Sequence, residues 1–291
     1  MIGLTLAPLL AGCRLPGHEG PVSESLATCR QLSQQGIAAL ERGERQNAEA
    51  LLDKAVKACP LDPEARRHYA EALWQRGAQQ KAVAQLAEAA RQASDDATLQ
   101  VRLAEMYLAM GQTEAARRHA EQAVNLNPRL AGPWAIRGRV MRAVGQPQEA
   151  LADCHRALRY APDDRRILLE VAELYRQLNQ PDRALQTLQT VADTYSPGEE
   201  SPEVLHLTGM AYMALGRYDE AVESLAAAAT RGKPSTDIFY RLGEAQWLAG
   251  RADEAAATAQ QALALMPSHQ PSRDLLGRIE LARQPQQPPL R

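Results

Sequence analysis

Small residues recur among larger apolar ones with a step of 34 residues, from near Gly36 to Pro267. The eighth position of each copy is always small: Gly36, Ala70, Ala104, Gly138, Ala172, Gly209 and Gly243. The twentieth is always alanine: Ala48, Ala82, Ala116, Ala150, Ala184, Ala221 and Ala255. A glycine inside a helix costs about 1 kcal/mol relative to alanine, so its repeated use indicates two helices whose axes approach closely. The pattern predicts stacked helix pairs, each sharing its core with its neighbours.

The fifteenth position marks the turn between the two helices of each copy. It is glycine in six copies, and Asn179 replaces the glycine in the fifth. Both residue types tolerate the left-handed backbone conformation that ends a helix. Pro60, Pro128, Pro162 and Pro267 follow the second helix in four copies, where proline stops a helix because it lacks the backbone donor. Each copy is therefore predicted to be a helix, a tight turn and a second helix.

The fourth copy, residues 131–164, shows the whole motif. Its internal positions 4, 8, 15, 20, 27 and 32 are Trp134, Gly138, Gly145, Ala150, Ala157 and Pro162. This motif resembles the tetratricopeptide repeat, a helix-turn-helix unit. The resemblance implies an all-α, right-handed solenoid of about seven repeats over residues 23–269. The expected repeats begin near Cys29, Pro63, Ala97, Ala131, Arg165, Pro202 and Thr236.

The two ends of the chain lie outside this array. Residues 270–283 are expected to form an amphipathic capping helix with Leu275, Leu276, Ile279 and Leu281 on its apolar side, because the last repeat would otherwise expose its core face. Residues 284–291 are rich in proline and glutamine and are predicted to be a disordered tail.

The first residues are apolar from Ile2 to Gly12 and end in Leu10-Ala11-Gly12-Cys13, which resembles the lipobox of bacterial lipoproteins. That resemblance implies a signal peptide over residues 1–12, lipidation of Cys13 and a flexible tether over residues 13–22. The protein would then be held at the bacterial cell envelope, at the outer membrane and facing the periplasm. No Lys or Arg precedes the apolar segment. Either the true start lies upstream of Met1, or the match is accidental and the protein is cytoplasmic.

The composition and the spacing of functional residues argue against nucleic-acid binding, metal binding and catalysis. The chain has 33 Lys and Arg against 35 Asp and Glu, so its net charge does not steer it toward nucleic acid. No two of the six histidines have helical metal-ligand spacing. Phosphate loops, dinucleotide fingerprints and nucleophile elbows are missing from the sequence. We therefore expect no enzyme activity, no metal and no cofactor.

Two cysteines occupy the first repeat, at its positions 1 and 31. An antiparallel helix pair brings these positions, Cys29 and Cys59, to the same end. A disulfide or two partly buried free thiols both fit the spacing. Cys154, at position 24 of the fourth repeat, is expected to pack in the core.

The family resemblance implies that the first helices line a concave face, where positions 2, 5, 6, 9, 12 and 13 meet a partner. The candidate residues are Arg67, His68, Glu71, Trp74, Arg102, Glu105, Arg139, Arg142, Glu173, Arg176, Tyr240, Arg241, Glu244 and Trp247. Trp, Tyr and Arg are enriched at binding hot spots. Alternatively, the two tryptophans shield neighbouring repeats, and the arginines pair with nearby glutamates. The alternation of Glu and Arg suits a mixed-charge or basic segment with apolar anchors.

These observations predict a membrane-tethered scaffold that binds a protein or peptide without turnover. The chain resembles tetratricopeptide lipoproteins that assist envelope assembly. An alternative is a recruiting or regulatory subunit of an envelope enzyme complex. The oligomeric state remains open.

Overall fold

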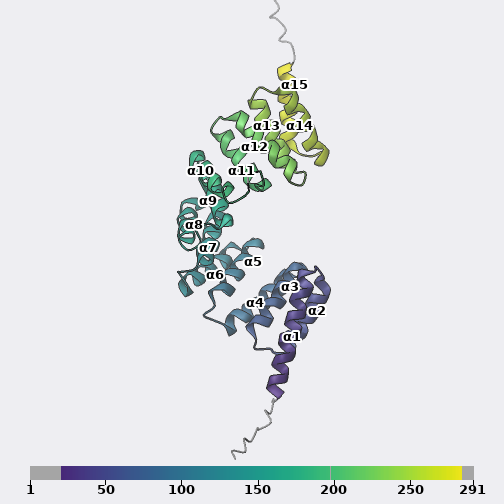
Figure 1. Cartoon of the computed structure of the whole chain (residues 1–291), viewed down its shortest axis with the longest axis vertical. Coiled ribbons are helices and arrows are strands. Elements are labelled where there is room, and N and C mark those ends of the chain that lie inside the picture. The colour runs from purple at the N-terminus through teal and green to yellow at the C-terminus, as the bar shows by residue number, and fades with distance from the viewer. Residues whose placement is uncertain (1–20, 197, 284–291) are drawn as a thin grey trace, which may run out of the picture. The chain divides into compact units, whose positions relative to one another are not determined.

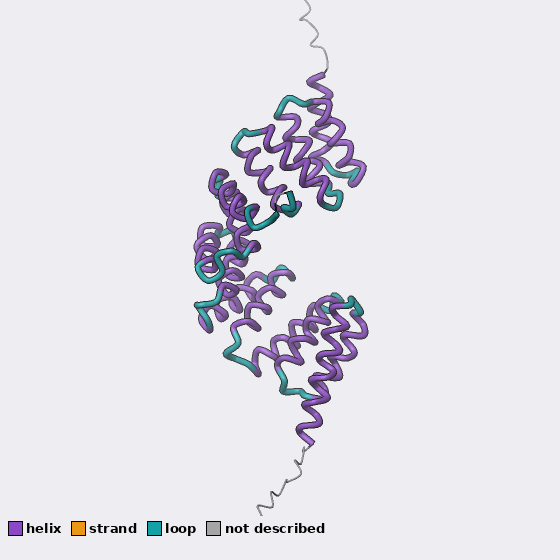
Figure 2. Tube along the Cα trace, viewed as in Figure 1, coloured by secondary structure: helices purple, strands orange, loops and turns teal. Residues whose placement is uncertain are grey.

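The computed structural model describes residues 21–196 and 198–283, with side chains from residue 24 onward. Helices joined by short loops make up all the regular structure in these residues (Figure 2). The predicted signal peptide, Cys13 and the predicted tail 284–291 lie outside the described residues. None of the described helices is long and apolar enough to cross a bilayer.

The chain divides into two compact units, one ending at Asp95 and the other starting at Asp96 (Figure 1). Unit one holds α1 (Pro21–Glu41), α2 (Arg45–Ala58), α3 (Pro63–Gln75) and α4 (Gln79–Gln92). Unit two begins with α5 (Ala97–Ala109), α6 (Thr113–Leu126), α7 (Ala131–Ala143), α8 (Pro147–Leu158), α9 (Arg165–Gln177) and α10 (Pro181–Ala192). It continues with α11 (Pro202–Ala214), α12 (Tyr218–Arg231), α13 (Thr236–Leu248), α14 (Ala252–Leu265) and α15 (Gln270–Arg283).

Seven helical hairpins followed by α15 confirm the predicted all-α repeat architecture in the described residues. From the second repeat to the seventh, every predicted start is the first residue of a helix. The first repeat differs, because α1 begins at Pro21 and Cys29 lies inside it. Residues 21 and 22, assigned to a tether above, are therefore helical.

The turns have the expected backbone conformation. All six glycines at position 15 have positive φ angles, from 72° at Gly111 and Gly216 to 85° at Gly77, and Asn179 has a φ of 55°. At the other end of the hairpins, five first helices are capped by a side chain that accepts a hydrogen bond from a backbone N–H of the first turn. These caps are Asp62, Asp96, Asp164, Ser201 and Ser235.

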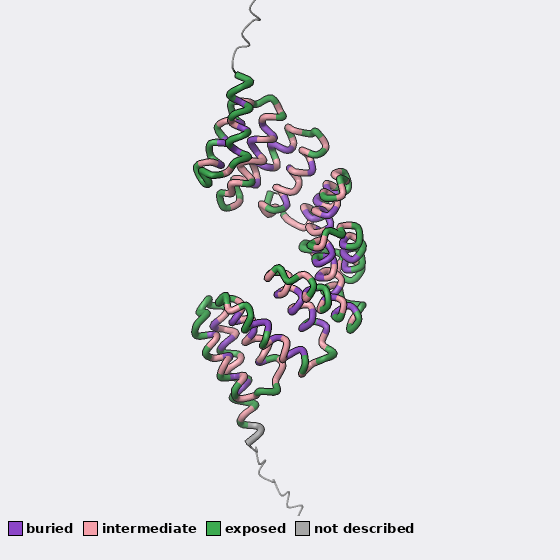
Figure 3. The backbone as a smooth tube through the Cα atoms, turned by 180° about the vertical axis from the view of Figure 1, so that it is seen from behind, coloured by how far each residue is buried: buried purple, intermediate pink, exposed green. Residues whose placement is uncertain are grey.

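The core runs between the two helices of each hairpin and into the next hairpin within each unit (Figure 3). All seven position-20 alanines are buried. In unit two, α15 covers the last hairpin, with Leu275 and Ile279 fully buried against Ala255 and Ala259. Leu281, which the sequence placed on the apolar side, is instead 69% exposed.

Cys29 and Cys59 lie in one apolar cluster where α1 and α2 meet, and both are free thiols. Cys29 Sγ donates to Asp62 Oδ2 at 3.7 Å, and Cys59 Sγ donates to the carbonyl of Ser25 at 3.6 Å. Burial is the main cause that raises the pKa of Cys29 to about 12. The thiols are thus neighbours at one end of the first hairpin, as the spacing predicted.

Candidate functional site

Two hollows lie side by side in unit two, on the first helices of its repeats. The charged hollow, of about 480 Å³, is lined by residues of α7, α9, α11 and α13. The apolar hollow, of about 250 Å³, is lined chiefly by α5, α7 and α9. Arg166 and Glu170 line both hollows. They therefore form one continuous surface, which we call the groove.

The helical repeat explains which side chains meet in the charged hollow. Residues three and four apart share one face of a helix. The α9 residues in the hollow are Arg166, Leu169, Glu170, Glu173 and Arg176. Those of α11 are Glu203, His206, Leu207 and Met210. Because successive first helices stack in register, the same face of each contributes to the hollow.

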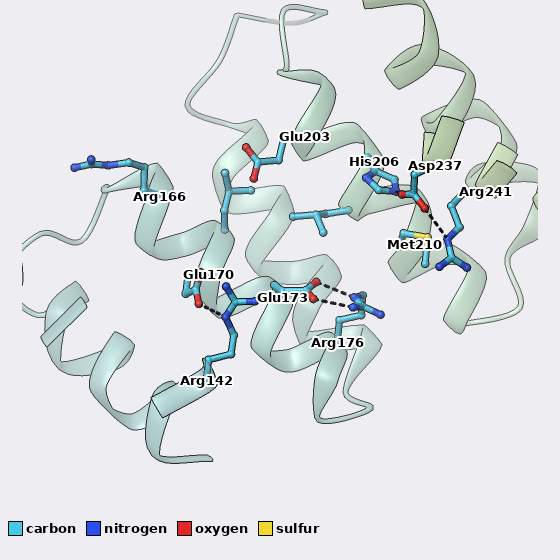
Figure 4. Close-up of a pocket in the computed structure, with 12 residues that line it drawn as sticks. Arg142, Arg166, Glu170, Glu173, Arg176, Glu203, His206, Met210, Asp237 and Arg241 are labelled. Carbon is cyan, nitrogen blue, oxygen red and sulfur yellow. Dashed lines mark hydrogen bonds and ion pairs between the residues drawn. The ribbon is translucent and has the colours of Figure 1, made fainter. Parts of the chain in front are cut away.

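The charges of this hollow largely pair with one another (Figure 4). Arg142 Nε of α7 lies 2.5 Å from Glu170 Oε1 of α9. Arg176 donates two hydrogen bonds of 2.7 Å to the Glu173 carboxylate. Between α11 and α13, His206 Nε2 lies 3.4 Å from Asp237 Oδ2. The hollow therefore presents positive and negative groups at fixed positions rather than an excess of one sign.

Burial and hydrogen bonding set the protonation of two groove residues. Burial alone would raise the pKa of Glu173, but hydrogen bonds from Arg176 and Gln177 outweigh it and lower that pKa. Burial lowers the pKa of His206, against the opposing effect of Asp237. At neutral pH the Glu173 carboxylate is therefore ionised and the His206 imidazole is mainly neutral.

The apolar hollow has a hydrocarbon floor and a charged rim. Its apolar lining is Val101, Ala131, Gly132, Ala135, Ile136 and Ile167, with the buried Cys154 of α8. Its charged lining is Glu105, Arg139, Asp164, Arg166 and Glu170. Glu105 of α5 lies 3.5 Å from Arg139 of α7, so the rim also links neighbouring repeats.

The structure brings six of the fourteen predicted partner-binding residues to the groove. Glu105 and Arg139 line the apolar hollow. Arg142, Glu173, Arg176 and Arg241 line the charged hollow. Their role in binding a partner stays a prediction.

Four predicted residues of unit two line neither hollow. Arg102 donates to Glu105 at 3.0 Å beside the apolar hollow. Tyr240 and Trp247 pack against the apolar cluster that α15 closes, and the Tyr240 hydroxyl donates to Glu244 at 3.2 Å. Trp247 therefore packs against the apolar core, in agreement with the alternative that the tryptophans shield neighbouring repeats.

The remaining four predicted residues, Arg67, His68, Glu71 and Trp74, lie on α3 in unit one. Arg67 pairs with Glu64 at 2.6 Å and lies 3.2 Å from His68 Nε2. Burial lowers the pKa of His68, and the charge of Arg67 acts in the same direction. These four residues therefore lie outside the groove, which belongs to unit two.

Several groove residues were not among the predicted ones. Arg166, Leu169, Glu203, Leu207 and Asp237 line the charged hollow from positions 2, 5 and 6 of their repeats. The register that selected the other residues includes these positions, so the signal was present in the sequence. Residue type does not explain why all five were left out, because Arg166 is of a type enriched at hot spots.

The groove holds no arrangement of nucleophile and base among the described residues. Burial raises the pKa of Cys154 to about 12, so its thiol is protonated. His155 points elsewhere, with Nε2 lying 3.1 Å from the Tyr175 hydroxyl. The described part of the chain also has no group of three His, Cys, Asp or Glu residues able to hold a metal ion. What the groove offers is an open surface with apolar and paired polar groups.

A stacked array of helical hairpins with an open groove defines an α-solenoid of the protein-binding kind. Tetratricopeptide repeat models match residues 33–97, 97–130, 141–208 and 206–269. The chain belongs to the tetratricopeptide repeat family.

Individual relatives are distant. A curated relative, the TPR repeat-containing thioredoxin TTL4 of Arabidopsis thaliana, is 31% identical over 102 residues, which span 35% of this chain and 15% of that protein. A chain of the APC/C hetero-tetramer Cut9-Hcn1 is similar with a TM-score of 0.72 and 15% identity, over 84% of this chain and 48% of that one. PilW, a type IV pilus biogenesis factor, has a TM-score of 0.66 and 18% identity, over 74% of this chain and 98% of that one. At these identities the solved structures support the fold alone.

Proposed function

We propose that unit two binds an extended segment of a partner protein in its groove and holds it without chemical change. The observation that carries this proposal is the continuity of the two hollows, which share Arg166 and Glu170. A continuous surface across successive first helices suits a ligand longer than a single side chain. The tetratricopeptide fold hosts many roles. The kind of partner must therefore be inferred from the residues that line the groove.

The paired charges of the groove indicate how the segment is recognised. Ion pairs such as Arg142 with Glu170 and Arg176 with Glu173 present donors and acceptors at fixed positions. A segment with polar groups of both signs can match them, whereas a uniformly charged polymer meets repulsion from half of them. This pattern favours a mixed-charge peptide over nucleic acid.

Capture of partners by groove variants tests the proposal. The purified chain should retain a partner from an envelope extract, and Arg139→Ala, Arg142→Ala, Arg166→Ala together should reduce that retention about tenfold or more, since hot-spot arginines each contribute over about 1 kcal/mol. The matched control is Arg117→Ala, Arg118→Ala, Arg159→Ala, which removes the same charge from exposed positions outside the groove. Equal capture by both triple variants, measured by quantitative mass spectrometry, contradicts the proposal.

We also propose that the protein is anchored at the bacterial cell envelope through lipid on Cys13. The lipobox-like run Leu10 to Cys13 supports this anchor, and the similarity to PilW accords with an envelope role. Several acyl chains on one residue give a lasting hold, because each buried methylene contributes about 0.8 kcal/mol.

Mass spectrometry of the mature amino terminus tests the anchor. We expect the protein purified from membranes of a bacterial host to begin at an acylated Cys13, and a Cys13→Ser variant to lose the modification and leave the membrane fraction. A Cys13→Ser variant that still sediments with the membranes, or a wild-type chain that keeps residues 1–12, contradicts it.

A further inference from the structure

The apolar hollow owes its space to the small residues that α7 carries at positions 2 and 5 of its repeat. These are Gly132 and Ala135, whereas α9 has Arg166 and Leu169 at the same positions. A Cβ added to Gly132 would meet only the Val101 methyl carbons, at 3.9 and 4.0 Å. The surface between α5 and α7 is therefore open at these positions.

The floor and volume of this hollow suit a large apolar group. Ile136 and Ile167 are 2% and 6% exposed, and their side chains lie with Val101 and Ala135 in the lining. The hollow measures about 250 Å³, and an apolar cavity of about 150 Å³ is enough to hold benzene. One aromatic ring, with part of the backbone of the residue that carries it, therefore fits. Burying that ring removes apolar surface of the hollow and of the ring from water.

The rim favours an aromatic ring over an aliphatic chain. The Arg166 side chain is 91% exposed and lies 3.7 Å from its nearest ion-pair partner, Asp164. Arg139 is also exposed, with a long contact of 3.5 Å to Glu105. A guanidinium held this loosely can turn to stack on a ring face, where the ring quadrupole attracts it.

The same repeat already contains such an arrangement. The guanidinium carbons of Arg137 and Arg156 lie 4.6 and 4.9 Å from the Trp134 ring centre. That ring belongs to the chain itself and does not line the apolar hollow. It shows that guanidinium groups of this repeat stack on an aromatic ring, the contact that Arg139 and Arg166 could offer to a ring in the hollow.

We propose that the apolar hollow is an anchor pocket for one aromatic side chain of the partner segment. The inference rests on the proposed function, because the rest of that segment would lie along the charged hollow next to it. Single buried aromatic anchors surrounded by polar contacts dominate many protein interfaces. The anchor would set the position of the segment, and the ion pairs of the charged hollow would select its polar residues.

Titration of the full chain with N-acetyl-L-phenylalaninamide tests the pocket without a partner. Methyl NMR should show saturable shifts of the Val101, Ile136 and Ile167 methyl groups at millimolar probe. N-acetyl-L-leucinamide should bind more weakly at the same methyl groups. Absence of saturable shifts at these methyls overturns the pocket, and equal or tighter binding of the leucine probe overturns its aromatic preference.

Gly132→Leu provides the blocking variant, with Gly277→Leu as its control. The leucine at Gly132 should weaken probe binding about tenfold or more, because it occupies the space that the ring requires. Gly277 lies in the α15 helix, with nothing within 4 Å of an added Cβ, and its leucine should leave probe binding unchanged. Undiminished probe binding by Gly132→Leu overturns the proposed location.

The same two variants separate this inference from the proposed function. Loss of both probe and partner by Gly132→Leu, with normal capture by Gly277→Leu, supports the anchor. If Gly132→Leu loses the probe yet captures the partner as wild type does, the anchor is overturned while groove binding stands. If the arginine triple variant also captures normally, the groove function itself fails.

Discussion

Replacing Arg137 by methionine is expected to lower the free energy of unfolding by about 3 kcal/mol, the low end of the range for breaking a buried ion pair. Arg137 of α7 donates two hydrogen bonds of 2.7 Å to Asp153 of α8. The Asp153 side chain is only 4% exposed. Without Arg137 it keeps one partner, Arg156 at 3.0 Å. The substitution also removes a guanidinium from the face of Trp134.

Urea denaturation of the full chain, followed by circular dichroism, measures this effect. The matched control is Arg117→Met, which breaks an exposed pair with Glu121 at 2.9 Å, both side chains being 44% exposed. Exposed pairs contribute about 0.2–1 kcal/mol, so the control should change little. Arg137→Lys should fall between the two, since lysine keeps the charge but cannot make both hydrogen bonds at once. A loss in Arg137→Met no larger than in the control contradicts a stabilising role for the buried pair.

The repeat architecture was predictable because its signals are local and repeated. A position-15 glycine or asparagine with positive φ ends each first helix, and position-20 alanines are buried in every hairpin. Each signal occurs seven times, so one irregular copy does not obscure the period. The start of α1 was less predictable, since no preceding repeat sets it.

The Arg137–Asp153 pair could not be found in the same way. Asp153 lies on a second helix, where an acidic residue ordinarily faces solvent. Its burial depends on Arg137 reaching across from the first helix of the same hairpin, and on Trp134 covering the arginine. The division of the chain after Asp95 has no signal in the period either, because the 34-residue step continues through it.

The groove was predicted in its position but only partly in its residues. The family register places the groove on the first helices, and Arg142, Glu173 and Arg176 lie there. Small residues such as Gly132 and Ala135 have no hot-spot character, so a search for binding residues passes over them. A hollow arises where side chains are small. It can be recognised in a sequence only when neighbouring repeats are compared at the same positions.

Replacing Gly138 by leucine is expected to destabilise the fourth repeat by about 1–3 kcal/mol, the usual range for overpacking a core. A Cβ on Gly138 would lie 2.9 Å from Cys154 Sγ and 3.1 Å from the carbonyl oxygen of Ala150. The carbonyl belongs to the backbone of α8, so relief requires α7 and α8 to move apart. Because α8 also packs on α9, that movement would disturb the floor of the groove.

Gly277→Leu separates overpacking from helix propensity. Both substitutions exchange a helical glycine for leucine, which by itself favours the helix by up to about 1 kcal/mol. Gly277 is exposed, with open space around an added Cβ, so its leucine should slightly stabilise unit two. The difference in the free energy of unfolding between the two variants, measured by urea denaturation, therefore gives the cost of forcing α7 and α8 apart. If Gly138→Leu is as stable as Gly277→Leu, close approach of these helices is not the reason for glycine at this position.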